Sequence, residues 1–220
     1  MVHPTKAPDR VERFIIGWDA GVPVKVTEAV AKPETREGVA LSVYEPGRVL
    51  AEGLESVFNY VDAAASRNGV GSLGMVETRY VGMKSRGEYH APGHTVLLNA
   101  HRDIEGLCLT GSLILEKDRR MPDFAAMVYN GYWFDPVCAA HRAFVTGTQK
   151  FATGETRVAL YKGNVITEGR RSSYSLYDAN VATMDGENEA YRQEDARGFI
   201  RLHALPLRVR RKVQGPPEGA

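Results

Sequence analysis

The sequence predicts an α+β fold, in which a mostly antiparallel sheet packs with about four helices and a C-terminal strand leads into a flexible tail. Strand-like segments come first, segments with helical spacing of apolar residues follow, and strand-like segments return after Gly154. Strands and helices that occur in separate blocks, rather than in strict alternation, are typical of α+β domains.

The first strands are expected between Phe14 and Val26, joined by a turn at residues 19–21 (Asp-Ala-Gly). Pro23 has no N–H to give to a ladder, so we expect the second of these strands at a sheet edge. Two prolines and two glycines interrupt residues 29–48, and this pattern predicts a loop there.

Apolar residues then recur at helical spacing in four segments. The predicted helices are residues 49–67, residues 96–108, a segment that starts at Pro122, and residues 138–148. Asn68-Gly69 is expected to end the first helix, because glycine adopts the left-handed conformation that closes many helices.

The remaining predicted elements are strands. One is expected over residues 73–83, and two more follow Gly154, joined by a turn at residues 162–164 (Lys-Gly-Asn). Residues 199–209 predict a final strand. We expect a single domain over residues 11–210, between a flexible N-terminus at residues 1–10 and a disordered tail at residues 211–220.

The composition of the 220 residues is ordinary for a globular protein and excludes several classes. Lys and Arg number 28 against 27 Asp and Glu, a balance that argues against nucleic acid or an anionic membrane as partner. No run approaches the roughly 18 apolar residues of a membrane span, and the N-terminal residues lack the apolar stretch of a signal peptide. Cys108 and Cys138 form no Cys-x-x-Cys pair, so we expect free thiols and a cytoplasmic protein.

Three familiar patterns occur without the context that would give them a function. Residues 69–74 read Gly-x-Gly-x-x-Gly, but a helix precedes them and a strand follows, the reverse of a dinucleotide site, so a turn is expected. Histidines 90, 94 and 101 with Asp103 lack the spacing of known metal motifs, and we predict no metal. Neither cysteine lies in a local nucleophile signature.

Residues 75–92 are the best candidate for binding a small zwitterion or anion. On one strand, Glu77 and Arg79 share a face, although their geometry alone favours a solvated ion pair on an edge strand. Lys84-Ser85-Arg86-Gly87 brings two cations and a hydroxyl beside a glycine, where they could close around an anion. Tyr89 adds a hydroxyl that can orient a polar ligand.

These residues also carry a resemblance to a known family. The ordered set KSRG, YNGYWF, YKGN, SYSLYD and GFI, together with the early GVPVKV, resembles the C-terminal, synthetase part of argininosuccinate synthase. The resemblance covers roughly residues 10–210 and is weakest in the 30s and 40s.

The resemblance implies a carbon–nitrogen ligase of arginine biosynthesis. In this family the ureido oxygen of citrulline attacks the α-phosphate of ATP, pyrophosphate leaves, and the amine of aspartate displaces AMP. ATP, with magnesium, binds an N-terminal domain through a Ser-Gly-Gly-x-Asp loop, which this sequence does not contain. We therefore expect this chain to bind no cofactor itself, and to need an ATP-binding half for activity.

Two citrulline-contacting positions of the family map onto Glu77 and Tyr89, with Arg79, Lys84, Ser85 and Arg86 as candidate supports. A carboxylate suits the α-ammonium of citrulline, and a phenol can hydrogen-bond its polar end. Five nearby residues depart from the family pattern, and their effect on activity is left open: Ser72, Gly74, Thr78, His90 and Ala91.

The sequence leaves three functions open. The chain could supply the citrulline surface of a synthase. The ATP-binding half would then be a separate polypeptide, or the chain would be a truncated gene product. It could instead be a divergent, non-catalytic module that binds a ligand or pairs subunits, since family members form homotetramers. The third alternative is an unstable fragment whose apolar face lacks a partner.

Overall fold

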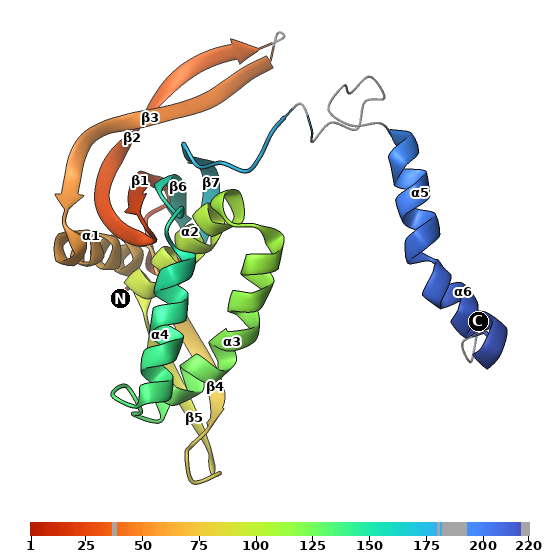
Figure 1. The fold of residues 1–220 in the computed structure, drawn as a ribbon. Helices are drawn as coiled ribbons and strands as arrows, with labels where there is room; N and C mark the ends of the chain where they lie inside the picture. The colour runs from red at the N-terminus through yellow and green to blue at the C-terminus, as the bar shows by residue number, and fades with distance from the viewer. Residues whose placement is uncertain (37–38, 180, 182–192, 217–220) are drawn as a thin grey trace. The chain divides into compact units, whose positions relative to one another are not determined.

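The computed structural model of the chain describes residues 1–36, 39–179, 181 and 193–216 (Figure 1). It divides into two compact units, Met1–Leu176 and Tyr177–Ala220, and each is described by itself. The larger unit contains both sheets and four of the helices, and it holds every residue of the candidate binding site.

A five-stranded antiparallel sheet forms the centre of the larger unit. The strands run in the order β3-β2-β1-β6-β7, so the first and the late strands of the chain pair directly. Their bounds are β1 Glu12–Asp19, β2 Val22–Arg36, β3 Val39–Glu52, β6 Gly154–Tyr161 and β7 Asn164–Arg171. The predicted α+β class with mostly antiparallel pairing is confirmed.

Helices and a second, two-stranded sheet complete this unit. The helices are α1 Leu54–Arg67, α2 Pro92–Cys108, α3 Gly111–Tyr129 and α4 Pro136–Thr148, and a 3₁₀ turn covers Pro4–Lys6. The second sheet is the hairpin of β4 Ser72–Thr78 and β5 Lys84–His90, which extends beside α3 and α4 (Figure 1). The hairpin follows α1 and leads directly into α2.

The hydrophobic core lies between the five-stranded sheet and helices α1 and α2. Alternate residues of β1 (Phe14, Ile16 and Trp18) point into it, as the period of two in a strand requires. Helices α1 and α2 supply apolar stripes at helical spacing against this face. The largest contributors from the helices and β6 are Val57, Val61, Val96, Ile104, Val158 and Leu160.

The predicted loop at residues 29–48 is wrong, because β2 and β3 form one long hairpin there. Pro46 lies opposite Ala29, next to a register shift. Because β3 is the edge strand of the sheet, the missing N–H of Pro46 breaks no ladder. The expected edge position of β2 is also wrong, since β2 lies between β3 and β1. Pairing with β3 begins only at Lys25, so Pro23 itself has no neighbour on that side.

Three other boundaries differ from the expectations. Helix α1 begins at Leu54, after Gly53, because residues 49–52 belong to β3. The single strand expected over 73–83 is a hairpin that turns at residues 79–83. Helix α3 begins after the N-cap Thr110, whose hydroxyl accepts from the Leu113 N–H, and Pro122 lies inside the helix rather than at its start.

The smaller unit contains helices where the sequence predicted a strand. Residues 199–209 lie in α5 Gln193–His203 and α6 Leu205–Gln214. The predicted strand is wrong: Pro206 occupies the first turn of α6, where its missing N–H costs no hydrogen bond. Residues 211–214, expected in the disordered tail, end this helix, and 217–220 lie outside the described residues.

The N-terminal residues, expected to be flexible, form hydrogen bonds with α1 and β6 within the larger unit. The Val2 N–H donates to the Ser66 carbonyl at 2.9 Å, and the Tyr161 hydroxyl donates to Asp9 at 2.6 Å. Among the described residues, none of the helices combines the length and hydropathy needed to cross a bilayer.

Candidate functional site

The β4–β5 hairpin carries most of the predicted site, and its register decides which residues meet. Glu77 pairs directly with Ser85, and Leu73 pairs with Tyr89, so these four side chains belong to one face. Val76 pairs with Arg86 on the opposite face. A strand alternates its side chains, so this register divides the predicted residues between two faces.

Hydroxyl groups surround the carboxylate of Glu77. The Ser85 hydroxyl donates to Glu77 Oε1 at 2.9 Å. The nearby Tyr89 hydroxyl, and then the hydrogen bond from Ser85, hold the pKa of Glu77 below its usual value, and Glu77 in turn raises the pKa of Tyr89. The hydroxyl donors favour the ionised carboxylate, so Glu77 presents a negative charge at neutral pH.

Tyr129, the last residue of α3, is a third hydroxyl beside Glu77. Its pKa is raised first by burial and then by its hydrogen bond to Glu77. Sequence reasoning did not identify this residue, because 52 positions separate it from Glu77 and no local pattern connects the two. Tyr129 is the first residue of the resembling YNGYWF segment, but that resemblance gave it no role.

The predicted supporting residues are only partly brought together. Ser85 contacts Glu77, whereas Arg79 lies in the turn after β4 and contributes least among the groups that lower the pKa of Glu77. Lys84 donates to Thr78 on the opposite face, where Arg86 also lies. The two cations and Ser85 therefore do not close around one anion, because the segment is an extended strand rather than a loop.

The residues that depart from the family pattern also lie mainly away from Glu77. Ser72, Gly74 and Thr78 occupy the opposite face of β4, and Ser72 pairs with His90 at the end of the hairpin. Ala91 precedes α2 and its N–H donates to the Gly71 carbonyl at 2.9 Å. None of these five residues forms a hydrogen bond or an ion pair with the Glu77 carboxylate.

The face that carries Glu77 is open. Leu73 and Met75, its neighbours on the same face of β4, are 55% and 40% exposed, and Tyr89 is 43% exposed. At the hairpin tip the Tyr132 hydroxyl donates to the Tyr80 hydroxyl at 2.8 Å, which fastens the turn to the loop after α3. The candidate site is therefore a solvent-exposed surface on the hairpin, and not a closed pocket.

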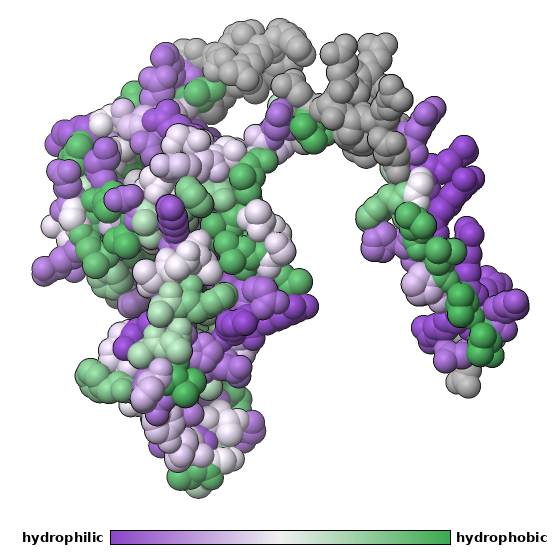
Figure 2. All heavy atoms as spheres, in the orientation of Figure 1, coloured by the Kyte–Doolittle hydropathy of each residue, from purple (hydrophilic) through white to green (hydrophobic). Residues whose placement is uncertain are grey.

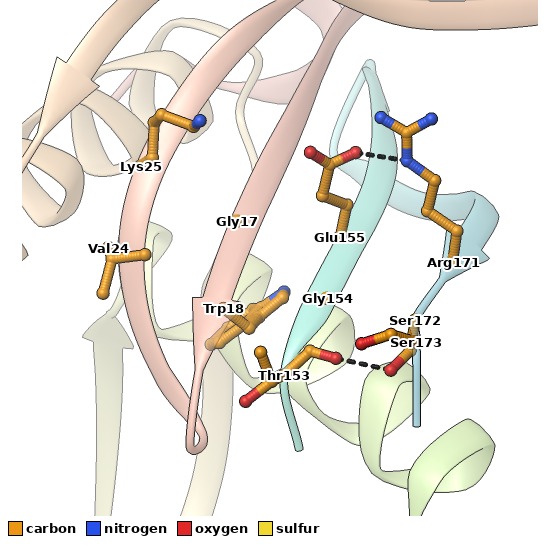
Figure 3. Close-up of a pocket in the computed structure, with 10 residues that line it drawn as sticks. All are labelled: Gly17, Trp18, Val24, Lys25, Thr153, Gly154, Glu155, Arg171, Ser172 and Ser173. Atoms are coloured by element: carbon orange, nitrogen blue, oxygen red, sulfur yellow. Dashed lines mark hydrogen bonds and ion pairs between the residues drawn. The ribbon is translucent and has the colours of Figure 1, made fainter. Parts of the chain in front are cut away.

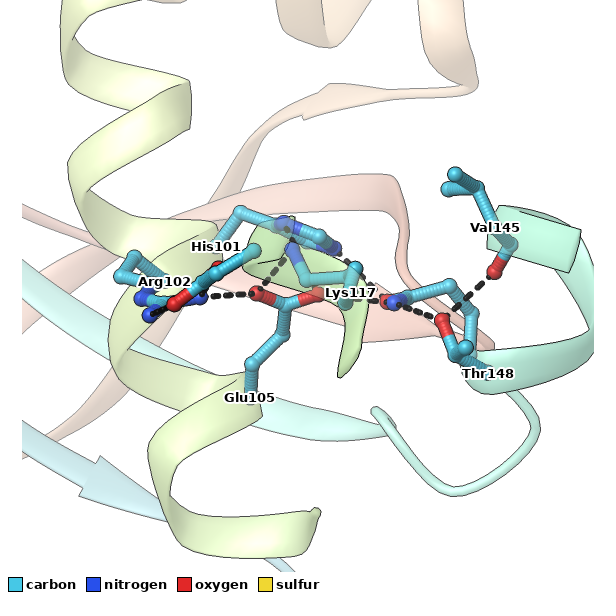
Figure 4. Close-up of polar contacts among 8 residues, drawn as sticks. His101, Arg102, Glu105, Lys117, Val145 and Thr148 are labelled. Carbon is cyan, nitrogen blue, oxygen red and sulfur yellow. Dashed lines mark hydrogen bonds and ion pairs between the residues drawn. The ribbon is translucent and has the colours of Figure 1, made fainter. Parts of the chain in front are cut away.

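A second polar cluster lies inside the larger unit (Figure 4). Glu105 is fully buried on α2, with Lys117 Nζ at 2.8 Å and Gln149 Nε2 at 2.7 Å from its two oxygens. His101 Nε2 contacts Gln149 Oε1 at 2.9 Å, and burial lowers the pKa of this histidine. Hydrogen bonds and ion pairs connect these groups, while Glu105 Oε2 has only its ion-pair neighbours and no hydrogen-bond partner. Such connections are typical of a structural network joining α2, α3 and the end of α4.

A cavity of about 500 Å³ lies between β1, β2 and β6 (Figure 3). Glu155 accepts a hydrogen bond from Arg171 Nε at 2.6 Å along its edge, and the Ser172 hydroxyl donates to the Thr153 carbonyl. No residue of the predicted site lines it. The cavity and the Glu77 face are separate features of this unit.

The patterns that sequence analysis set aside have structural positions. In residues 69–74, α1 precedes and β4 follows, and Gly69 and Gly71 have φ of +71° and +96°, as a turn requires. Within the described residues, no group of three or more His, Cys, Asp or Glu side chains is placed to hold a metal ion. Cys108 and Cys138 are free and buried. The predictions about ATP and magnesium stay predictions.

Comparisons with known proteins agree on one family. The model of the arginosuccinate synthase C-terminal domain matches residues 1–210. Argininosuccinate synthases from Thermoanaerobacter sp., Rhodopirellula baltica and Magnetococcus marinus are 44%, 41% and 39% identical over 210, 212 and 217 residues.

These alignments include 96% to 99% of this chain but only 46% to 48% of each relative. The chain thus spans about half the length of the curated relatives it matches. The family model fits the whole larger unit and extends into the smaller one. The chain belongs to the argininosuccinate synthase family, and it corresponds to the C-terminal part.

Proposed function

We propose that this chain supplies part of the citrulline site of an argininosuccinate synthase, which joins citrulline to aspartate with ATP. The observation that supports this most directly is the ionised Glu77 carboxylate, held by Ser85 and Tyr89 on an open face. An amino acid's ammonium group can approach that carboxylate from solvent and form a charge-assisted hydrogen bond.

The residues of this chain would bind and orient, and the rest of the reaction would take place in a neighbouring half. Glu77 would hold the α-ammonium of citrulline, and the Tyr89 hydroxyl would contact another polar group of the substrate. This anchoring would place the ureido oxygen toward the α-phosphate of ATP, which an ATP-binding half with its magnesium would hold. Positioning of this kind contributes to rate by fixing the attacking atom in place.

Calorimetry of the 220-residue chain with citrulline tests the binding step. We expect saturable binding that E77Q weakens by about tenfold or more, because the charge-assisted hydrogen bond is lost. E88Q is the matched control, since Glu88 is exposed on the opposite face of the same hairpin. Equal binding by E77Q and the unaltered chain would contradict the proposed role of Glu77.

A reconstitution assay tests the reaction. The Thermoanaerobacter relative, whose matched region is 44% identical to this chain, supplies the ATP-binding half. This half is mixed with the chain, citrulline, aspartate and ATP. We expect pyrophosphate release above that of the ATP-binding half alone, and a lower rate with E77Q. If no ratio of the two parts releases pyrophosphate above the background, the catalytic proposal fails.

A subunit-pairing module is the second candidate, and the α5–α6 unit supports it. Apolar side chains at helical spacing run along these helices with basic residues beside them, and Figure 2 displays this stripe in green. The exposed members are Phe199, Leu202, Leu205, Val209 and Val213. Two helices this short bury little surface on their own, so we propose that the stripe packs against a second copy of the chain.

Sedimentation equilibrium tests this candidate. We expect an oligomer that the double variant L202E/V209E dissociates, because a charge on the stripe opposes burial. The matched control, R201E/R208E, changes charge on exposed positions beside the stripe and should leave the assembly intact. Dissociation by both double variants alike would count against an apolar interface.

A further inference from the structure

Gly87 lies between Ser85 and Tyr89 on the face of β5 that carries the Glu77 site. In the ladder it faces Met75, one step from the Glu77–Ser85 pair and one step from the Leu73–Tyr89 pair. Its backbone is part of an extended strand and has no positive φ. Backbone conformation alone therefore does not require glycine at this position.

The space above Gly87 is filled by the side chain of Tyr89. A Cβ atom built on Gly87 would lie 2.8 Å from Cε2, 2.9 Å from Cζ and 2.9 Å from the hydroxyl oxygen of Tyr89. Carbon atoms that are not bonded approach to about 3.5–4.0 Å, so any larger residue would displace the ring. Tyr89 thus folds back along its own strand, in the direction of Glu77.

Gly74 provides a contrast on the same hairpin. It lies on β4 opposite Glu88, on the face away from Glu77, and a Cβ atom there would meet nothing within 4 Å. One glycine of the hairpin is therefore crowded by a site residue, and the other is not.

We propose that Gly87 is a positioning residue: it leaves the space through which Tyr89 brings its hydroxyl to the Glu77 carboxylate beside Ser85. The contact keeps the carboxylate and the phenol together on one open face, where an amino acid ligand would meet both. The identity of that ligand rests on the proposed function, whereas the contact between Tyr89 and Glu77 does not. The lowered pKa of Glu77, for which the Tyr89 hydroxyl is the largest cause, agrees with this arrangement.

Nuclear magnetic resonance titration of the Glu77 side-chain carboxyl tests the contact without any ligand. We expect G87A to raise the pKa of Glu77, as Y89F does, because both remove the hydroxyl that favours the ionised form. G74A should leave the titration unchanged. If G87A titrates like the unaltered chain and like G74A, the proposal is overturned.

A background variant separates positioning from a general folding defect. In Y89A the ring is gone, so G87A added to Y89A should not lower the melting temperature and should not change the Glu77 titration. A loss of stability from G87A that persists in the Y89A background would overturn the proposal, since the crowding atoms belong to Tyr89.

Citrulline calorimetry then connects the contact to binding. We expect G87A to weaken the affinity by about tenfold, the effect of losing one hydrogen bond to a charged group, while G74A changes it less than about twofold. If the unaltered chain binds no citrulline but G87A still shifts the Glu77 titration, the proposed function fails and the positioning role stands. If citrulline binds and G87A matches G74A in both measurements, the positioning role fails.

Discussion

Lys117 Nζ lies 2.8 Å from Glu105 Oε2 in the interior of the larger unit, where Glu105 has no exposed surface and Lys117 is 8% exposed. The pair connects α2 with α3, and Gln149 donates to the other oxygen of Glu105. A buried pair of this kind adds little net stability compared with apolar residues, but it cannot lose one partner without leaving an isolated charge. The pair therefore fixes how α3 is placed on α2.

K117M tests the ion pair. We expect it to lower the free energy of unfolding by up to about 3–5 kcal/mol in urea denaturation, because Glu105 stays buried with only the more distant Arg102, at 3.7 Å, as a cation. The double variant E105Q/K117M removes both charges and keeps an acceptor for Gln149, so its loss should be smaller. R48M is the surface control: its pair with Glu28 is largely exposed, and the loss should be below about 1 kcal/mol. Equal losses in K117M and R48M would refute the buried-pair interpretation.

The pH dependence of stability follows from His101. Burial lowers the pKa of His101, while Glu105 at 3.8 Å opposes the shift and Lys117 and Arg102 add to it. The unfolded state then binds the proton more tightly than the folded state. The contribution of neutral His101 to the free energy of unfolding is complete above the usual histidine pKa of about 6.5. It is lost as the pH falls through the lower pKa of His101 in the folded state.

Thermal melts near about pH 7.5 and about pH 5.5 check this sign. Stability should fall toward acid by at most about 1.4 kcal/mol per pH unit from this group. H101Q removes the titration, so its change between the two pH values should be smaller than that of the unaltered chain. H94Q, at an exposed histidine of the same helix, should retain the full change.

Gly71 and Gly147 are expected to respond to alanine in opposite directions. Gly71 has a φ of +96°, and a Cβ atom there would lie 2.5 Å from Pro92 Cα at the start of α2. G71A should therefore lower the free energy of unfolding by at least about 2 kcal/mol. Gly147 lies in α4 with open space around it, so G147A should raise stability by about 0.5–1 kcal/mol. Urea titrations of both variants measure the difference, and a stable G71A would contradict the close approach.

Thr156 holds the indole of Trp18 in the core. The Trp18 Nε1–H donates to the Thr156 hydroxyl at 2.8 Å, and both residues are buried. T156V keeps the shape but leaves the N–H without an acceptor, which should cost about 1–3 kcal/mol of unfolding free energy. T156S keeps the hydroxyl and should lose less. Tryptophan fluorescence during denaturation reports on both variants, and an identical midpoint for T156V and the unaltered chain would exclude the hydrogen bond as a stabilising contact.

The sequence predicted elements well where the periodicity was local and undisturbed. The α2 and α4 helices and the β6–β7 hairpin at Lys162-Gly163 were recognised because each carries its own apolar period or turn signal. The β2–β3 hairpin was missed, since its prolines and glycines read as a loop until the edge position of β3 is known. Helices α5 and α6 were missed because residues 199–209 were predicted as one strand, although apolar residues recur there at helical spacing and Pro206 suits the first turn of a helix.

The candidate site was predicted in part for a similar reason. Glu77, Ser85 and Tyr89 were all named as candidate residues and lie on one face of the hairpin, but the turn at residues 79–83 divides the one expected strand into two. That turn decides which face each residue occupies, and it moved Lys84 and Arg86 away from the carboxylate. Tyr129 lies at the end of α3, outside the hairpin, and its contact with Glu77 depends on the tertiary fold rather than on any local pattern.

The position of β1 in the sheet has a consequence for how the chain acquires its fold. Strand β1 pairs on one edge with β2, which directly follows it in the chain, and on its other edge with β6. The Trp18–Thr156 contact joins residues 138 positions apart. A ribosome that has released α1 through α4 has therefore not yet supplied the strand that closes the sheet. Folding of the larger unit should be slow for its size and should finish only after β6 has emerged, so premature termination before residue 154 would leave β1 with an open edge prone to aggregation.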